Sequence, residues 1–300
     1  MPTKKNDLNM IQAWMTAVRA RTIPIPTIQV MTGTALAYAY LGSINWLMVF
    51  FTWVVAVMIT FGTNLINDVY DIEKGGDHEN RVGHLKVIRA GLISQKMVFI
   101  AGLTAFGIAI LFSIPLAAHA GWGIFFLVTL CATIGYGYTG GPYPICYMGL
   151  SEVFILLFYG FVLVGASFYV QTGYMTGPAY FLGFQMGLLA ILPNALNNFR
   201  DMYEDAEVKK LTFAVKHGAT FARWEIALLT AIPFILCIGW LVAGYPESAF
   251  MPLLLTPMAF LFVRSVWTTK PGPLFNRYFA LSVLIHFFFG LLMVVGFLLR

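Results

Sequence analysis

Two short segments of the 300-residue chain carry acids and amides at helical spacing, and their chemistry is that of a metal site. Their members are Asn64, Asn67, Asp68 and Asp71 in the first segment, and Asn197, Asn198, Asp201 and Asp205 in the second. Residues three or four apart are neighbours on a helix, so each set would present one polar face. Oxygen ligands with neither His nor Cys favour Mg²⁺ over zinc or copper. We therefore predict a magnesium site whose ligands are Asn67, Asp68, Asp71, Asp201 and Asp205.

Basic residues follow each acidic segment. They are Arg81, Lys86 and Arg89 after the first segment, and Lys209 and Lys210 after the second. Carboxylates alone would indicate a cation site, whereas carboxylates interleaved with Lys and Arg indicate a metal-bridged polyanion, most simply a diphosphate. Mg²⁺ is usually bound through a few carboxylates together with substrate phosphates, which is the arrangement that these residues offer.

The elements that must position these residues are membrane-spanning helices. Hydrophobic residues make up 59% of the chain and charged residues 10%, against about 25% charged residues in an average soluble domain. Nine apolar stretches of roughly 17–23 residues are each long enough to cross a hydrocarbon core about 30 Å thick. They cover residues 22–41, 46–66, 97–116, 121–138, 150–170, 178–196, 224–244, 249–266 and 278–299. We predict an all-α polytopic membrane protein, a bundle of nine transmembrane helices, and leave open whether the short eighth stretch is a full crossing.

The basic residues predict the orientation of this bundle. With nine spans, every Lys and Arg except Arg300 falls on one side of the membrane. The positive-inside rule places that side, and the N-terminus, in the cytoplasm, so we expect a multi-pass protein of the cell (inner) membrane, with the lipid bilayer as a partner and no nucleic acid. The acidic segments begin at the cytoplasmic ends of the second and sixth spans, where we expect them to face a hydrated boundary above a cytoplasm-facing cavity. A transporter is the alternative class, but proton-coupled transporters more often place acids in the middle of a span.

The two acidic segments resemble the aspartate-rich motifs of the UbiA superfamily of intramembrane aromatic prenyltransferases. The resemblance runs from about residue 14 to residue 218, and its supporting strings are Arg19-Ala-Arg21-Thr-Ile-Pro24, Tyr138-Thr-Gly140-Gly141-Pro142, Gly149-Leu-x-Glu152 and Lys210-x-Thr212. It is strongest to the branch that prenylates 1,4-dihydroxy-2-naphthoate in menaquinone biosynthesis. That branch shares Gly75 and Asp77, where other members carry an Asp four residues after Asp71.

The resemblance implies a single integral-membrane domain over residues 1–300, with catalytic loops at about 67–96 and 197–223. It implies that a polyprenyl group passes from polyprenyl diphosphate to 1,4-dihydroxy-2-naphthoate, with release of diphosphate and CO₂, and that two Mg²⁺ ions bridge the diphosphate. The catalytic residues are then Asp68, Asp71, Asp201 and Asp205. The residues assigned to the diphosphate are Arg81, Lys86, Arg200, Lys210, Asn64 and Asn197.

A further set of residues is assigned to the aromatic acceptor and the prenyl channel: Arg21, Tyr138, Tyr143 and Asn198. Tyrosine rings around the Gly-Gly-Pro turn either line the path of an allylic carbocation or form an interfacial aromatic belt. Glu152, at the start of the fifth span, is either an interfacial charge or a functional one. Departures from the family pattern at His84, Lys86 and Lys209 leave other acceptors open, namely a futalosine-route menaquinone intermediate, 4-hydroxybenzoate or homogentisate.

Overall fold

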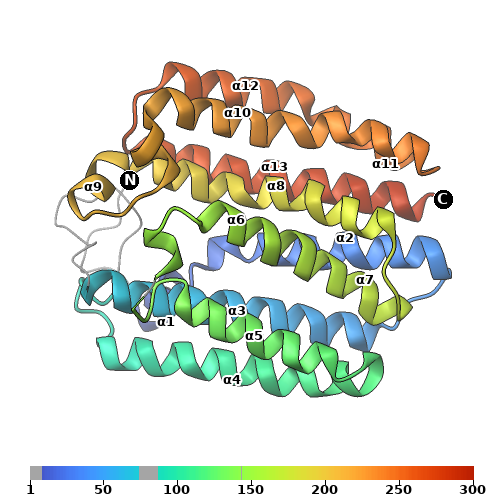
Figure 1. Ribbon diagram of the computed structural model, residues 1–300, viewed down its shortest axis with the longest axis horizontal. Coiled ribbons are helices and arrows are strands. Elements are labelled where there is room, and N and C mark those ends of the chain that lie inside the picture. The colour runs from blue at the N-terminus through green and yellow to red at the C-terminus, as the bar shows by residue number, and fades with distance from the viewer. Residues whose placement is uncertain (1–8, 74–86, 143) are drawn as a thin grey trace.

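The structure is a computed structural model that describes residues 9–73, 87–142 and 144–300. Over these residues the chain forms helices and connecting turns, with no β-strand, and its long helices run side by side along one axis (Figure 1). The long helical segments are α2 (Pro24–Leu41), α3 (Trp46–Glu73), α4 (Gln95–Ala120), α5 (Gly123–Gly137), α6–η3–α7 (Ser151–Thr172), α8 (Gly177–Arg200), α10 (Phe213–Val242), α11–η4–α12 (Pro246–Thr268) and α13 (Phe275–Leu298). The predicted all-α membrane bundle is confirmed.

Each predicted span corresponds to one of these segments. Seven of them, within the part of the chain that the structure describes, are long and apolar enough to cross a membrane. The two outside that set are α2, with 18 residues, and α5, with 15. The number of nine full crossings therefore remains a prediction, whereas the eighth predicted span, at 23 residues, is within the set of seven.

The centre of the bundle is α8. In its apolar stretch 78% of the residues are buried, against at most 56% in the other six candidate spans. It lies against η3 (Leu156–Val164), a stretch of π-helix, through glycines: a Cβ on Gly160 would lie 2.5 Å from the carbonyl oxygen of Gly183. Small residues allow such close approach of helices in membranes. The helix that carries Asn194, Asn198 and, at its end, Asp201 is thus fixed by packing.

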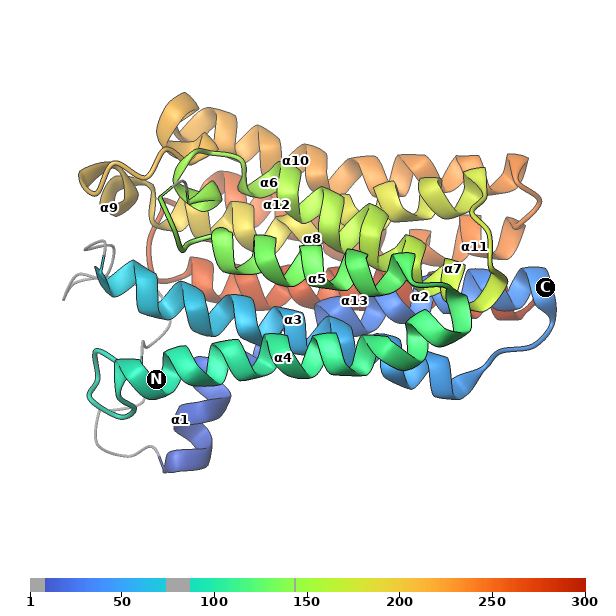
Figure 2. The same cartoon turned by 60° about the horizontal axis from the view of Figure 1, so that its bottom comes forward.

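Short elements gather at one end of the bundle. They are α1 (Met10–Ala17), η1 (Ala20–Thr22), η2 (Ile145–Tyr147) and α9 (Met202–Glu207). Figure 2 shows α1 lying across the direction of the long helices. Its Ala13 and Ala17 are buried beside Leu65 of α3, whereas Ile11 is 75% exposed. An apolar helix face directed outward and lying crosswise is typical of a segment at the membrane interface.

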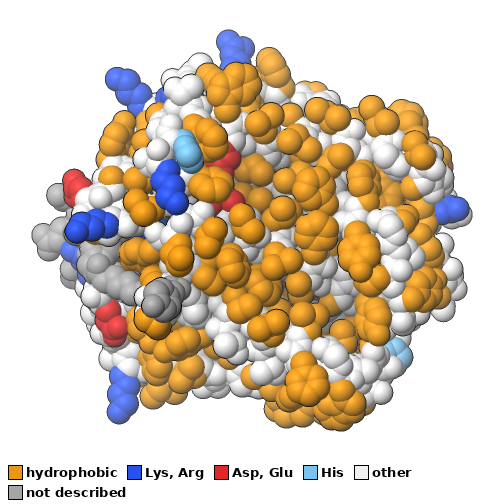
Figure 3. Space-filling view, viewed as in Figure 1, with side chains coloured by type: hydrophobic (Ala, Val, Ile, Leu, Met, Phe, Trp, Pro, Cys, Tyr) orange, Lys and Arg blue, Asp and Glu red, His pale blue; other side chains and the backbone are white. Residues whose placement is uncertain are grey.

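The outer surface suits a lipid environment. Figure 3 shows hydrophobic side chains over the middle of the visible face, with most charged side chains at the end where α9 lies. Large apolar side chains such as Phe126, Ile238 and Leu254 are more than 60% exposed. Contiguous exposed apolar surface of this extent would be a liability in water, and it is the expected covering of a bundle in a bilayer.

Candidate active site

The four predicted catalytic aspartates lie at the same end of the bundle. Asp68 and Asp71 are in the last turns of α3, Asp201 is the C-cap of α8, and Asp205 is in α9 (Figure 1). Their exposed fractions are 0%, 8%, 2% and 4%. The expectation that they face a hydrated boundary is wrong for this structure, because each carboxylate is enclosed by polar partners that the following paragraphs describe.

The segment before α2 covers the first acidic cluster. Arg19 donates from Nη2 to Asp68 Oδ1 over 2.9 Å, and Asn64 donates from Nδ2 to the carbonyl oxygen of Val18 over 3.1 Å. Arg19 has a left-handed backbone (φ +55°) between α1 and η1, which turns the chain over the end of α3. Arg19 was not among the predicted site residues, although it opens one of the strings that carry the family resemblance.

Asp71 belongs to a second set of contacts on α3. In the orientation that satisfies its neighbours, the Asn67 amide nitrogen donates to Thr139 Oγ1 (3.1 Å) and to both Asp71 carboxylate oxygens (3.2 and 3.1 Å). The Tyr147 hydroxyl donates to Asp71 Oδ1 over 3.4 Å. The predicted metal ligands Asn67 and Asp71 are therefore in direct contact, and the loop between α5 and α6 reaches them.

The second acidic cluster contains an ion pair at each of its aspartates. Arg200 donates from Nε and Nη2 to the two carboxylate oxygens of Asp201 (2.5 and 2.7 Å), and from Nη1 to Asn276 Oδ1 on α13 (2.6 Å). Lys210 Nζ donates to both carboxylate oxygens of Asp205 (3.3 and 3.2 Å). Two residues assigned to the diphosphate, Arg200 and Lys210, thus hold two of the predicted metal ligands.

The loop of residues 144–150 connects the two clusters. While its hydroxyl contacts Asp71, Tyr147 accepts a hydrogen bond at its carbonyl oxygen from the backbone nitrogen of Leu211, the residue after Lys210 (3.1 Å). Gly149 has φ +72°, and a Cβ there would lie 2.4 Å from the carbonyl oxygen of Leu211. A side chain at position 149 would push the two segments apart, so glycine is required at this contact.

A third polar group lies on the bundle side of these clusters. Glu152, at the start of α6 (Ser151–Ile155), is 5% exposed, and its Oε1 accepts hydrogen bonds from Asn198 Nδ2 (2.8 Å) and Asn194 Nδ2 (3.2 Å). The structure therefore excludes an interfacial, solvated position for Glu152. Asn198, assigned to the acceptor or prenyl channel, has this carboxylate as its partner.

The remaining predicted residues differ in exposure, and some of them are not described by the structure. Arg21 is exposed, while Asn197 and Tyr138 are half-buried. Three predicted residues fall outside the described part of the chain: Arg81, Lys86 and Tyr143.

The donor set fits a hard divalent cation, because all its ligand atoms are carboxylate or amide oxygens within an apolar bundle. In the ranges 9–73, 87–142 and 144–300, however, no three His, Cys, Asp or Glu side chains come close enough together to hold a metal ion. Asp68, Asp201 and Asp205 each form an ion pair with a cationic side chain. The structure thus shows a buried, charge-paired arrangement of the predicted ligands.

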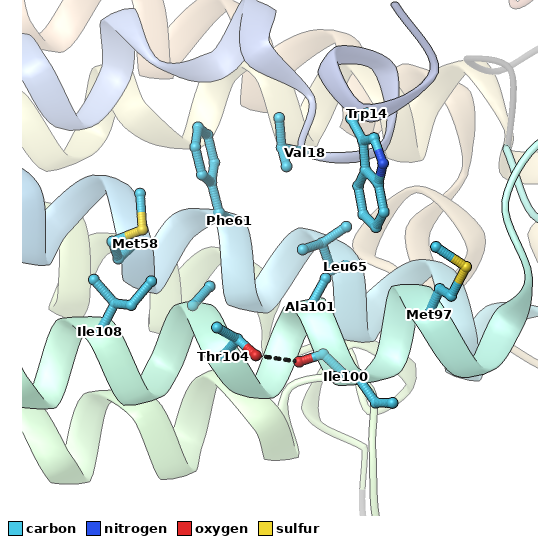
Figure 4. Close-up of a pocket in the computed structure, with 11 residues that line it drawn as sticks. Trp14, Val18, Met58, Phe61, Leu65, Met97, Ile100, Ala101, Thr104 and Ile108 are labelled. Atoms are coloured by element: carbon cyan, nitrogen blue, oxygen red, sulfur yellow. Dashed lines mark hydrogen bonds between the residues drawn. The ribbon is translucent and has the colours of Figure 1, made fainter. Parts of the chain in front are cut away.

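An apolar groove of about 470 Å³ lies beside the first cluster, between α3 and α4 and partly covered by α1 (Figure 4). Its lining includes Trp14, Phe61, Leu65, Met97 and Ile100. Leu65 lies one turn before Asp68 on α3, so the groove offers a hydrocarbon surface next to the charged end of that helix.

Known proteins are similar to this chain in sequence or in fold. Residues 28–292 match the model of the UbiA prenyltransferase family. A 1,4-dihydroxy-2-naphthoate octaprenyltransferase of Haemophilus influenzae is 30% identical over 99% of this chain and 100% of its own length. The fold resembles that of a UbiA homologue from Aeropyrum pernix K1 (TM-score 0.70, 13% identity, 94% of this chain and 98% of the other). It also resembles that of a UbiA homologue from Archaeoglobus fulgidus bound to DMAPP and Mg²⁺ (TM-score 0.58, 14% identity, 94% and 99%). The chain therefore belongs to the UbiA prenyltransferase family.

Proposed function

We propose that this protein transfers a polyprenyl group from polyprenyl diphosphate to 1,4-dihydroxy-2-naphthoate, and that diphosphate and CO₂ are released. The observation that carries the proposal is the set of buried aspartates paired with Arg19, Arg200 and Lys210 at one end of an apolar bundle. The activity in the name of the Haemophilus influenzae relative, which aligns over the full length of both chains, supports the choice of acceptor.

The donor diphosphate is proposed to bind between the two acidic clusters. Asn67, Asp68, Asp71, Asp201 and Asp205 would hold two Mg²⁺ ions. The Archaeoglobus fulgidus homologue bound to DMAPP and Mg²⁺ supports the use of this metal. Bound Mg²⁺ would neutralise charge on the diphosphate as it leaves.

The chain's own cations act on the same leaving group. Lys210 and Arg200 are held within the site by Asp205 and Asp201, so they are in place to bind phosphate oxygens. Arg81, Lys86, Asn64 and Asn197 are proposed as further diphosphate ligands. Preorganised donors of this kind stabilise developing negative charge more strongly in a dry site than in water.

The bundle protects the reacting carbon. Departure of the diphosphate leaves an allylic carbocation, which water would capture, and the surrounding helices exclude water from it. The rings of Tyr138 and Tyr143 are proposed to stabilise the cation through their faces. Arg21 and Asn198 are proposed to lie near the acceptor.

The direct test is turnover by the full-length protein in lipid nanodiscs. The reaction contains Mg²⁺, a polyprenyl diphosphate and either 1,4-dihydroxy-2-naphthoate, 4-hydroxybenzoate or homogentisate, and the product is identified by mass spectrometry. We expect a decarboxylated prenylnaphthohydroquinone from the first acceptor alone. A product only from another acceptor would refute the assignment, and no product from any of them would refute prenyl transfer.

The metal is tested by chelation and by substitution. EDTA should abolish turnover and Mg²⁺ restore it, and Asp71→Asn should lower kcat by at least about 10²-fold, as expected for loss of a charge-stabilising group. Glu247→Gln, in α11 at the other end of the bundle, is the matched control. Turnover that is indifferent to EDTA, or near wild type in Asp71→Asn, would overturn the magnesium assignment.

We further propose that residues 1–300 form one domain of the cell membrane with the N-terminus and the acidic end in the cytoplasm, because the basic residues gather there. A fusion tag at the N-terminus should be digested only when protease reaches the cytoplasmic side. Digestion of the tag by protease added outside intact cells would contradict a cytoplasmic N-terminus.

A further inference from the structure

Glu152 has an arrangement that packing does not explain. Both asparagine donors, Asn194 and Asn198, bind the same carboxylate oxygen, Oε1. The other oxygen, Oε2, is buried and has no hydrogen-bond partner within the described residues. A buried carboxylate oxygen without a donor is costly, and a bound donor group would remove that cost.

The position of Glu152 relates it to the diphosphate end of the bundle. Asn194, Asn198 and Asp201 are four and three residues apart, so they share one face of α8. Because a helix rises 1.5 Å per residue, Asn198 lies about 4.5 Å before Asp201 along α8, on the side of the bundle interior. Lys210, which binds Asp205, also acts electrostatically on Glu152. A group bound at Oε2 would therefore lie next to the place proposed for the diphosphate, on its apolar side.

The geometry points to Oε2 of Glu152 as the binding site for a hydroxyl group of the aromatic acceptor, and to Glu152 as the base that accepts the hydroxyl proton. This inference rests on the proposed function. A phenolic hydroxyl is the donor that an unfilled carboxylate oxygen lacks, and the two asparagines hold the carboxylate in one orientation while leaving that oxygen open to the substrate.

The reaction balances because Glu152 accepts one proton from the acceptor and later donates it back. The C–O bond of the prenyl diphosphate breaks and its electron pair leaves with the diphosphate. The ring carbon that bears the carboxylate forms the new C–C bond, while the neighbouring hydroxyl passes its proton to Glu152 and becomes a ketone. The bond to the carboxylate then breaks, CO₂ leaves, and the electron pair restores the aromatic ring as an enolate. Glu152 returns the proton to that oxygen, so the reaction needs no other acid or base.

Within the described ranges, titratable groups on neighbouring elements act on Glu152 electrostatically. They are Lys210 after α9, Glu225 of α10, and Tyr138 at the end of α5. None of them has a hydrogen bond to Glu152 among the contacts of the described residues, whereas Asn194 and Asn198 have no proton to exchange near neutral pH. Glu152 is therefore the group whose replacement should alter the pH profile of turnover.

The test compares Glu152→Gln with Glu247→Gln in nanodiscs, with Mg²⁺, a polyprenyl diphosphate and 1,4-dihydroxy-2-naphthoate. Gln keeps the size of the side chain and an acceptor for the two asparagines but cannot take a proton. We expect kcat to fall by about 10²–10³-fold, as for loss of a general base, the acidic limb of the pH profile to disappear, and the apparent KM of the diphosphate to stay near wild type. The control should match wild type. A wild-type kcat and pH profile in Glu152→Gln would overturn the inference.

A substrate-side test covers the case in which the variant does not insert. The wild-type protein is given two methyl ethers of the acceptor, one blocking the hydroxyl next to the carboxylate and one blocking the distant hydroxyl. Only the second should be prenylated, and equal kcat/KM for both would overturn the inference. If the wild-type protein does not prenylate the unmodified naphthoate at all, the proposed function itself has failed. With an active wild type, the two ethers show which hydroxyl gives up its proton, and Glu152→Gln tests which residue accepts it.

Discussion

The Arg200–Asp201 ion pair gives the sharpest test of how the fold supports the site. Arg200 is 8% exposed and Asp201 2%, and two hydrogen bonds join them. Replacing Arg200 with Gln leaves the Asp201 carboxylate buried without that guanidinium, and breaking a buried pair from one side costs about 3–5 kcal/mol. We expect the lower end, about 3 kcal/mol, because Asp201 has further polar contacts.

That loss converts to a shift that a thermal melt can measure. At about 2–4 °C per kcal/mol for a large domain, Arg200→Gln should lower Tm by roughly 6–12 °C. Arg264→Gln, an exposed position on α12 (Thr256–Thr268), is the matched control and should stay within about 1–2 °C, since surface substitutions change stability by about 0.5 kcal/mol or less.

A double variant separates stability from catalysis. In Arg200→Gln/Asp201→Asn neither side chain is charged, so much of the lost Tm should return, while diphosphate release stays far below wild type because a proposed metal ligand is gone. Melting by intrinsic fluorescence and pyrophosphate release are measured on the same inserted protein. A single variant that melts with wild type would refute the buried-pair reasoning, and a double variant with wild-type turnover would remove Asp201 from the site.

Further predictions concern charge, packing and pH. Lys210→Gln should lower kcat by about 10²–10³-fold, as for loss of a donor to a developing anion. Lys209→Gln, at the exposed neighbouring position, should retain wild-type pyrophosphate release. Equal losses of pyrophosphate release in both variants would indicate an effect on membrane topology instead. Gly33→Ala places a Cβ 2.4 Å from a backbone oxygen and should lower the free energy of unfolding by roughly 1–3 kcal/mol, measured as a lower Tm, while Gly107→Ala, with open space, should leave Tm unchanged. Burial raises the pKa of Tyr245, so its contribution to stability is present below pH 10 or so and is lost as pH rises through the higher folded-state pKa. Tyr245→Phe should therefore flatten the decline of Tm above about pH 10, and an unchanged decline would contradict this.

The fold was predictable because the bilayer imposes a length on each helix. Runs of apolar residues long enough to cross the hydrocarbon core located all nine long helical segments, since backbone polar groups in lipid must be satisfied within a helix. The boundaries were less accurate where helices continue beyond the apolar run. The span expected at 46–66 extends to Glu73 as α3, and this extension places Asp68 and Asp71 on a rigid helix rather than in a loop.

The partners of the site residues were not predictable in the same way. Helical spacing relates residues three or four apart, but Asp68 pairs with Arg19, 49 positions away, and Arg200 contacts Asn276, 76 positions away. These contacts depend on which helices pack together at the charged end. The charge pattern alone therefore indicated the residues of the proposed site and left their burial undetected.

Because the acidic clusters are buried, their carboxylates must be paired with cations or hydrogen-bond donors before any substrate binds. A carboxylate removed from water is tolerated only with a counter-charge or several hydrogen bonds, and the residues that supply these are the same cations that a diphosphate would attract. Asp205 and Lys210 illustrate the point: the pair satisfies the buried acid and keeps the ammonium inside the site. Arg19 does the same for Asp68 from the opposite side of the bundle end. The charges proposed to assist diphosphate departure are thus held in position by the fold, so binding of the proposed substrate would exchange partners among groups already present and would not have to order them from solvent.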